Sequence, residues 1–386
     1  MSLVFHWFLP TSGDGRGIVG GGHAADSGPG SALRAQAATR PPDIEYLAQI
    51  ARAAEQLGFT GVLTPTGTWC EDAWLVTSAL ISQTQRLKFL VAFRPGLSSP
   101  TLAAQMAATY QRISRGRLLL NVVTGGDDTE QLRFGDRLSH DQRYARTGEF
   151  LDIVRGAWSG TPYDFAGEHY QVKGATVLSA PDPVPDVYFG GSSDAAGPVA
   201  AKYVDVYLTW GEPPAQVARK IAWMRELAGM AGRRLRFGIR LHTISRDTAK
   251  QAWAEANQML EGLSMAEING AQKKLASSVS VGQERMRSLH SAYRDGGSAA
   301  DLEIYPNLWA GVGLVRGGAG TALVGSHSAV ADRIEEYAAL GIEEFIFSGY
   351  PHLEEAYWFG EGVLPELRRR GHVQAPADLS GLLATA

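Results

Sequence analysis

The stretch "PPDIEYLAQIARAAEQLGFTGVLT", residues 41–64, contains the unit whose repetition decides the fold. Its first part has apolar residues at the 3.6-residue period of a helix with one buried face, namely Ile44, Leu47, Ile50, Ala51 and Ala54. Gly58 then marks the end of the helix, because glycine adopts the left-handed conformation that follows many helices. The short apolar run "GVLT" (61–64) comes next and predicts a buried strand.

The same alternation of helix and strand continues along the chain. Eight short apolar runs are separated by longer, helix-forming stretches. The runs are "VFHWFL" (4–9), "GVLT" (61–64), "KFLVAF" (88–93), "RLLLNVV" (117–123), "DVYFG" (186–190), "VDVYLT" (204–209), "RFGIRLHTI" (236–244) and "EFIFSG" (344–349). Eight strands with helices between them predict an α/β fold, a (β/α)8 TIM barrel of parallel strands. An open, doubly wound sheet is the alternative.

Composition limits the class of protein. The chain of 386 residues is 45% hydrophobic and 20% charged, which is ordinary for a globular protein with a large core. Its net charge is −4 and it has no long basic run, so we expect a small-molecule ligand and no nucleic acid. The N-terminal apolar run is too short to span a membrane and lacks the basic start of a signal peptide, and Cys70 has no second cysteine to pair with. We therefore expect a cytoplasmic protein.

Two segments exceed what a plain barrel needs. Residues 11–40 are rich in Gly, Ala and Ser and predict a flexible insertion after the first strand. Residues 262–325 lie between the seventh and eighth strands and end in "NLWAGVGLVRGGAGTALVG" (307–325), which is typical of a mobile lid. We expect a single domain over residues 1–386, with both insertions beside the active site, because the loops that follow barrel strands emerge on the catalytic face.

Arg240 and His242 are the most informative polar residues in the predicted strands. In "FGIRLHTI" (237–244) the strand period of two places them on one face, with Ile239 and Leu241 on the other. A buried unpaired arginine costs several kcal/mol, so it must meet either a carboxylate of the core or an anionic ligand. We favour the second interpretation, an anion-binding and proton-handling pair at the end of a barrel strand, and keep the internal ion pair as the alternative.

The stretch "YFGGSSDAAGPVAAKYVD" (188–205) favours a phosphate site. A strand ends just before Gly191, and Ser192 and Ser193 then lie where a helix begins. This position combines free backbone N–H groups, hydroxyls and the positive end of the helix dipole. The alternative is a tight turn in which Asp194 caps the helix.

Further candidate side chains follow predicted strands and so face the same end of the barrel. Cys70 follows the second strand, although a lone cysteine usually packs as a small apolar side chain. The aromatic and histidine candidates are Trp69, His140, Tyr144, Trp210, Tyr350 and His352. For Trp69, His140 and Tyr144 the alternative role is simple packing, and none of the candidates belongs to a group with the spacing of metal ligands.

Taken together, a series of motifs resembles the alkanesulfonate monooxygenase family, the desulfonating branch of the bacterial luciferase-like flavin monooxygenases. The motifs are "WFLPTSGDG", "PTGTWCEDAWL", "FLVAFRPG", "NVVTGG", "YFGGSSD", "LTWGEPP", "RFGIRLH", "NLWAGVGLVRGGAGTALVG" and "SGYPHLEEAY". They occur in the family's order from residue 3 to about residue 366, with residues 16–40 as the main gap.

This resemblance implies a luciferase-like barrel that uses reduced FMN (FMNH2) and O2 to cleave a carbon–sulfur bond, giving an aldehyde and sulfite. A separate NAD(P)H-dependent FMN reductase would supply the reduced FMN, and the chain would form a homo-oligomer, either a dimer or a tetramer. The implied catalytic residues are Cys70, Arg240, His242, Arg316 and Tyr350. The implied FMN site comprises Thr124, His140, Tyr144, Gly191, Ser192 and Ser193. The implied substrate contacts are Trp69, Trp210, Arg240, Arg316 and His352.

Departures from the family pattern affect the expected substrate. Where the family commonly has His after "FLPT" and the motif "TGRSCED", this chain has Ser12, Thr68 and Trp69. An indole at position 69 could stack on a polyhydroxylated ring, so a sugar sulfonate such as sulfoquinovose is the alternative to an alkanesulfonate. Two further functions stay open on the same barrel: a non-catalytic luciferase-like flavin-binding protein and a deazaflavin-dependent dehydrogenase.

Overall fold

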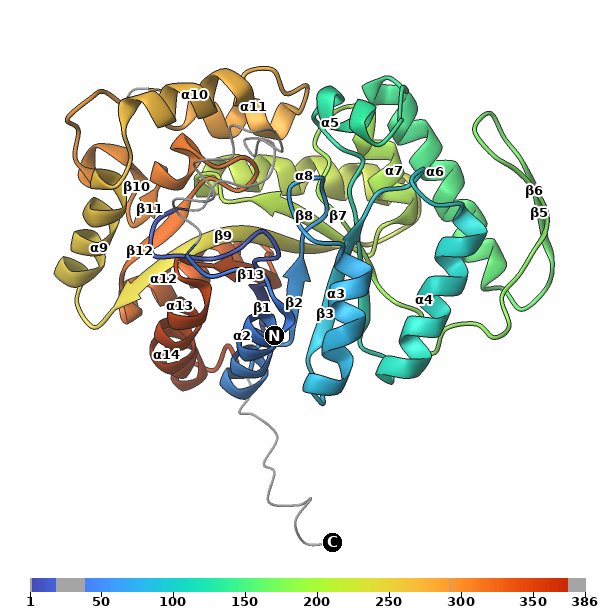
Figure 1. Ribbon diagram of the computed structural model, residues 1–386, viewed down its shortest axis with the longest axis horizontal. Coiled ribbons are helices and arrows are strands. Elements are labelled where there is room, and N and C mark those ends of the chain that lie inside the picture. Colours follow the sequence, from blue (N-terminus) through green and yellow to red (C-terminus); the bar gives the residue numbers. More distant parts are fainter. Residues whose placement is uncertain (1, 19–38, 292, 374–386) are drawn as a thin grey trace, which may run out of the picture.

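The strands form a closed parallel barrel, as the alternation of strands and helices predicts (Figure 1). The computed structural model describes residues 2–18, 39–291 and 293–373. The barrel strands are β1 (Val4–Phe8), β2 (Gly61–Thr64), β3 (Lys88–Phe93), β4 (Leu118–Val122), β7 (Val187–Phe189), β8 (Val206–Trp210), β9 (Arg236–Arg246) and β13 (Glu344–Ser348). Neighbouring strands pair in parallel, and β13 closes the ring between β9 and β1. All eight predicted strands are confirmed, and the open sheet is excluded.

Helices cover the outside of the barrel (Figure 1). They are α2 (Ile44–Leu57), α3 (Ala73–Leu80), α4 (Pro100–Ser114), α5 (Asp128–Arg133), α6 (His140–Ala157), α7 (Ala196–Tyr203), α8 (Pro214–Met230), α12 (His327–Ala339), α13 (His352–Trp358) and α14 (Leu364–Arg369), with a π-helical turn η5 (Phe359–Val363) before α14. Helix α2 begins where the Asp43 carboxylate accepts the Tyr46 N–H at 2.8 Å, and it ends at Gly58, whose φ is 95°. The predicted helix and its glycine stop are therefore confirmed. Among the described helices, none has the length and apolar character needed to cross a membrane.

The inside of the barrel is built in layers. Near the N-terminal ends of the strands, the Glu344 carboxylate accepts hydrogen bonds from Tyr188 and Arg236, each at 2.7 Å, and lies 3.2 Å from His6. An apolar layer follows, which contains Phe8, Leu63, Leu90, Leu119, Leu208 and Ile346. This layer separates the buried ion cluster from the C-terminal ends of the strands, where the candidate site lies.

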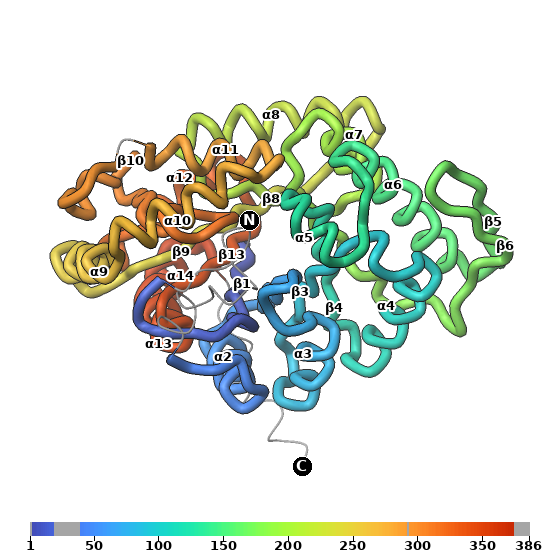
Figure 2. Tube along the Cα trace, turned by 45° about the horizontal axis from the view of Figure 1, so that its top comes forward, coloured from blue at the N-terminus to red at the C-terminus, as the bar shows by residue number. Residues whose placement is uncertain are grey.

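Strand β9 is longer than the other barrel strands and extends past the rim. The segment that follows it forms α9 (Ala249–Glu261), α10 (Met265–Leu275), α11 (Val281–Ser288), β10 (Glu303–Tyr305), β11 (Leu308–Trp309), the 3₁₀ turn η4 (Gly311–Leu314) and β12 (Ala322–Ser326). One edge of β9 pairs with β8 as far as Arg240 and with β12 from His242 onward, so an outer sheet continues the barrel wall. Figure 2 shows α10 and α11 along the rim towards α5.

Two peripheral segments complete the description. An antiparallel hairpin of β5 (Tyr163–Ala166) and β6 (Gln171–Ala175) projects from the side of the barrel opposite α9 (Figures 1 and 2). Most of the predicted flexible insertion at 11–40 lies outside the described residues. Its first residues run from the end of β1 to Asp14, which pairs through its backbone with Arg40 just before α2.

Candidate active site

A cavity opens at the C-terminal end of the barrel. Its wall includes ten of the predicted site residues: Trp69, Thr124, His140, Tyr144, Gly191, Ser192, Ser193, Trp210, Arg240 and Arg316. Residues 280–282 and 316–319 also line it, so the segment between β9 and β13 contributes to the site. The other four predicted residues, Cys70, His242, Tyr350 and His352, lie near the cavity and are not part of its wall.

The charged side chains of the wall are mostly cationic. Arg94, Lys220, Arg240 and Arg316 face the cavity, against the carboxylate of Glu130. Two of these cations are neutralised, because Arg94 donates to Glu130 at 2.5 Å and Lys220 pairs with Glu212 at 2.8 Å. Within the described residues, neither Arg240 nor Arg316 contacts a carboxylate. The alternative of an internal ion pair for Arg240 therefore has no partner in the part of the chain that the structure describes.

Arg240 and Arg316 lie together over the ring of Phe8. Their guanidinium carbons are 4.3 Å and 5.3 Å from the centroid of that ring. Both residues are more than nine-tenths buried, with 8% and 6% of their surfaces exposed. Burial, together with the positive charge of Arg316, lowers the pKa of Arg240 to about 9, which still leaves it charged at neutral pH. Two positive charges that are this close together and largely shielded from solvent are stabilised best by a bound anion.

A chain of hydrogen bonds connects Arg240 to the glycine-rich segment. Arg240 Nη1 donates to Ser348 Oγ at 3.2 Å, and this oxygen lies 2.8 Å from Nδ1 of His242. On the other side of the ring, His242 Nε2 lies 3.1 Å from the carbonyl oxygen of Ala319. Burial and the two nearby arginines hold the pKa of His242 well below its usual value, so the imidazole is neutral. His242 thus acts behind Arg240 as a hydrogen-bonding group.

A second buried layer stacks behind His242. The His242 and Tyr350 rings lie nearly parallel with centroids 5.5 Å apart, and Tyr350 and His352 meet edge to face at 5.1 Å. Tyr350 shares a hydrogen bond with Arg316, and His352 Nδ1 donates to the Asp14 carboxylate at 2.9 Å. Burial acts to raise the pKa of Asp14, but His352 and the surrounding donors keep it lowered. Tyr350 and His352 therefore support the arginine pair from behind the wall.

Cys70 lies beside the cavity, where the neighbouring Trp69 occupies the wall. The Cys70 thiol contacts the carbonyl oxygen of Gly67 at 3.6 Å. Burial raises the pKa of this thiol to about 12, so it is protonated at neutral pH. A buried, protonated thiol suits packing better than nucleophilic chemistry, because the thiolate is the reactive form.

The loop of residues 190–193 forms another part of the wall, at the beginning of α7. A Cβ at Gly191 would lie 2.7 Å from the Cβ of Ala196 and 2.8 Å from the ring of Phe189, so only glycine fits there. The cap position of α7 is held by Ala195 without a side-chain hydrogen bond, so the alternative in which Asp194 caps the helix is wrong. Ser193 instead accepts from the first N–H groups of α7, because its carbonyl oxygen lies 3.0 Å from Ala196 N and 3.2 Å from Gly197 N.

Hydroxyl groups and backbone donors converge on this loop. The Tyr144 hydroxyl interacts with the hydroxyls of Thr124 and Ser193, and these hydrogen bonds oppose the rise in its pKa that burial causes. His140 packs edge to face on the Tyr144 ring, with centroids 4.9 Å apart. Within the described residues, the backbone N–H groups of Ser192 and Ser193 have no intramolecular acceptor. This set of donors fits the phosphate group of FMN.

Removing one of these hydroxyls tests the phosphate site. Tyr144→Phe is expected to weaken FMN binding about 2- to 10-fold, which corresponds to one net hydrogen bond. Quenching of FMN fluorescence measures the Kd. Tyr110→Phe is the matched control, because Tyr110 is also buried but lies on α4 and does not line the cavity. An unchanged Kd for Tyr144→Phe, or an equal loss in the control, would remove this hydroxyl from the phosphate site.

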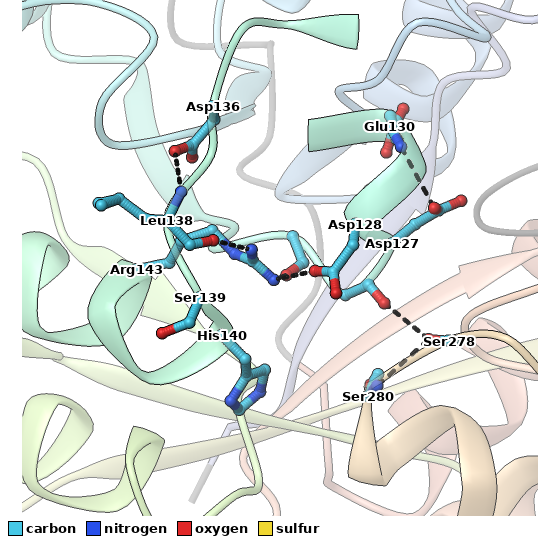
Figure 3. Close-up of polar contacts among 12 residues, drawn as sticks. Asp127, Asp128, Glu130, Asp136, Leu138, Ser139, His140, Arg143, Ser278 and Ser280 are labelled. Atoms are coloured by element: carbon cyan, nitrogen blue, oxygen red, sulfur yellow. Dashed lines mark hydrogen bonds and ion pairs between the residues drawn. The ribbon is translucent and has the colours of Figure 1, made fainter. Parts of the chain in front are cut away.

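The segment before α11 is attached to this side of the cavity (Figure 3). Ser278 Oγ donates to the carbonyl oxygen of Gly126, in the loop after β4, at 2.9 Å. Arg143 of α6 holds the beginning of α5, directly after the same loop, through an ion pair with Asp128 at 2.8 Å (Figure 3). These contacts position residues 280–282 on the cavity wall.

Sequence reasoning missed several residues of the wall and its support. They are Phe8, Arg94, Glu130, Lys220 and Ser348. Arg94 directly follows β3, so its place at a strand end was a usable signal. Lys220 offered none, because it lies within α8 and reaches Thr209 at 2.9 Å only once that helix packs against the barrel.

Comparison with known proteins places this site in context. A family model described as luciferase-like monooxygenase matches residues 5–344. A riboflavin lyase solved with modified FMN and riboflavin is 20% identical, with a TM-score of 0.76 over 100% of this chain and 96% of that one. DmoA from Hyphomicrobium sulfonivorans is 19% identical, with a TM-score of 0.75 over 98% and 91%. An F420-dependent secondary alcohol dehydrogenase is 17% identical, with a TM-score of 0.66 over 94% and 99%. At these identities the structures establish the shared fold.

Proposed function

Because the chain belongs to the luciferase-like monooxygenase family, we propose that it is an FMNH2- and O2-dependent sulfonate monooxygenase, which converts a sulfonate to an aldehyde and sulfite. The observation that carries the proposal is the buried pair of Arg240 and Arg316, which has no carboxylate partner among the described residues. A sulfonate has a fixed negative charge and three acceptor oxygens, so two guanidinium groups match it. Each charge-assisted hydrogen bond contributes about 1.5 to 3 kcal/mol.

The residues of the chain bind the reactants and limit access of water. Reduced FMN, held through its phosphate by Tyr144, Ser192 and Ser193, would supply two electrons to O2, so that one oxygen atom enters the substrate carbon and the other leaves as water. The sulfonate, FMNH2 and O2 would thus yield aldehyde, hydrogen sulfite, FMN and water. Arg240 and Arg316 would orient the sulfonate against Phe8. We also propose that a separate NAD(P)H-dependent reductase supplies FMNH2 and that the chain is a dimer or tetramer.

Release of sulfite tests this proposal directly. The protein is incubated with NAD(P)H, FMN, a flavin reductase, O2 and a panel of chemically diverse sulfonates, and reactions without O2 serve as controls. We expect equal amounts of sulfite and aldehyde from at least one sulfonate. FMN binding without sulfite from any sulfonate would favour a non-catalytic flavin-binding protein. Selective binding of a deazaflavin would favour a dehydrogenase.

A sugar sulfonate is the second candidate substrate, and the surroundings of Trp69 favour it. The indole lies on the cavity wall close to polar groups: a Cβ at Gly67 would be 2.2 Å from Trp69 Nε1 and 2.7 Å from Glu130 Oε1. Asn121 and Arg94 line the same cavity. An aromatic face beside hydrogen-bonding side chains suits a ring that carries hydroxyl groups.

A change at Trp69 distinguishes the two substrates. Trp69→Leu is expected to lower kcat/KM for sulfoquinovose about tenfold, because stacking on the indole is lost, and to change that for octanesulfonate less than about threefold. Trp74→Leu is the control. Trp74 packs against Phe93, with ring centroids 5.9 Å apart, and does not line the cavity. Equal losses for both sulfonates in Trp69→Leu would argue against a subsite for the sugar ring.

A further inference from the structure

The hydrogen bonds from Arg240 to the glycine-rich segment run in one direction only. Arginine has donors and no acceptor, so Arg240 must donate to Ser348 Oγ. The carbonyl oxygen of Ala319 only accepts, so Nε2 of His242 must carry the ring proton. The neutral ring then has a bare Nδ1, which accepts the hydroxyl proton of Ser348 at 2.8 Å. Each of the four groups therefore has a single possible role.

Ser348 joins Arg240 to His242 in this series of hydrogen bonds. It is the last residue of β13 and is paired with His242 in the strand register. Its side chain is fully buried, so solvent does not compete for the hydroxyl. Because the oxygen accepts from Arg240 while its proton is given to His242, the orientation of the hydroxyl depends on which nitrogen of His242 is protonated.

The series of hydrogen bonds that begins at Arg240 ends in residues 311–321, which we call the lid segment. This segment carries Arg316 and is closed at its base by a hydrogen bond from the Gly313 N–H to the Gly320 carbonyl at 2.8 Å. The bond from His242 to Ala319 is one of several that hold the segment where Arg316 faces the cavity; Gln272 donates to the carbonyl oxygens of residues 313 and 314, and Gln283 accepts from the N–H of residue 318. Arg240 on the barrel and Arg316 on the lid segment are therefore connected through buried groups.

We propose that Ser348 is a positioning residue that couples the lid segment to Arg240. When the Ala319 carbonyl lies against His242, it selects the tautomer protonated at Nε2, and Ser348 then presents a lone pair to Arg240. When the lid segment moves away, His242 loses the acceptor that selects this tautomer, and Arg240 loses a fixed partner. Closure of the lid segment thus positions Arg240 and Arg316 at the same time to bind an anion. The coupling goes beyond the proposed reaction, because it applies to any anionic ligand.

Ser348→Ala tests the coupling, because it removes one hydroxyl from the interior. In ¹⁵N NMR of histidine-labelled protein, with the signal assigned by its loss in His242→Asn, we expect the signal of the unprotonated Nδ1 of His242 to shift, because it loses the Ser348 proton, while the Ala319 carbonyl keeps the ring in the Nε2–H form. Hydrogen exchange of residues 311–321 is expected to become about tenfold faster, which corresponds to the loss of about one hydrogen bond. The kcat/KM for a sulfonate is expected to fall by about tenfold or more, through both arginines.

Ser245→Ala is the matched control. Ser245 is also fully buried on β9, and its hydroxyl lies 2.7 Å from Nδ1 of His327, but neither residue lines the cavity. This variant should leave the Nδ1 signal of His242 and the exchange of the lid segment unchanged. An unchanged Nδ1 signal and wild-type exchange in Ser348→Ala, or equal changes in Ser245→Ala, would overturn the coupling. Both readouts are obtained without turnover, so they decide the coupling even if no sulfonate is a substrate.

Discussion

Replacing Arg316 by alanine is expected to lower kcat/KM for the sulfonate about 10²- to 10⁴-fold, while the Kd of FMNH2 without sulfonate changes less than about twofold. Arg316 is 6% exposed and its guanidinium carbon lies 5.3 Å from the ring centroid of Phe8, so it would meet the proposed anion almost without water. Losing two charge-assisted hydrogen bonds costs about 3 to 6 kcal/mol, which accounts for the range. Sulfite release measures the turnover, and an anaerobic fluorescence titration measures FMNH2 binding.

A conservative variant separates the charge of Arg316 from its shape. Arg316→Lys keeps the positive charge but loses the planar fork that binds two oxygens at once, so we expect turnover between those of the wild type and Arg316→Ala. Normal turnover in Arg316→Ala would exclude this residue from substrate binding. A matching loss of FMNH2 affinity would instead assign Arg316 to the cofactor.

The barrel could be predicted because its signal is local and repeated. The helical period before Gly58 and the short apolar runs depend only on neighbouring residues, and the structure places strands at all eight runs. The outer sheet carries no such signal. Residues 322–325 lie inside the stretch interpreted as a glycine-rich lid, and they form most of β12 because β9 is long enough to extend past β8 and offer them an edge.

The candidate site could be predicted in part, for a related reason. A parallel barrel brings the ends of all its strands to one mouth, so Thr124 and Trp210, which follow or end strands, reach the same wall. Sequence position does not indicate depth: Trp69 lines the cavity while the adjacent Cys70 does not. The partners of the predicted residues are also hidden, because Ser348 is 108 residues from Arg240 and no local pattern connects them.

Replacing Arg240 by methionine is expected to stabilise the free protein. Burial and Arg316 lower the pKa of Arg240 to about 9, which means that the charged form costs free energy in the folded state. Below pH 9 the residue is charged both folded and unfolded, so the full cost is present; above pH 9 the folded protein releases the proton first and the cost fades. At pH 7, Arg240→Met should therefore raise the free energy of unfolding by about 1 to 4 kcal/mol, measured in urea.

The matched control for this variant is Arg117→Met. Arg117 is as buried as Arg240, at 8% exposed, but its guanidinium donates to Thr84 and to the carbonyl oxygens of Ser114, Ile81 and Leu87, so its loss should destabilise the protein. In Arg240→Met, turnover should fall about 10²-fold or more, and a sulfonate that raises the Tm of the wild type should no longer do so. A less stable Arg240→Met protein would mean that the folded chain itself compensates this charge. The anion would then no longer be needed to explain the buried arginine pair.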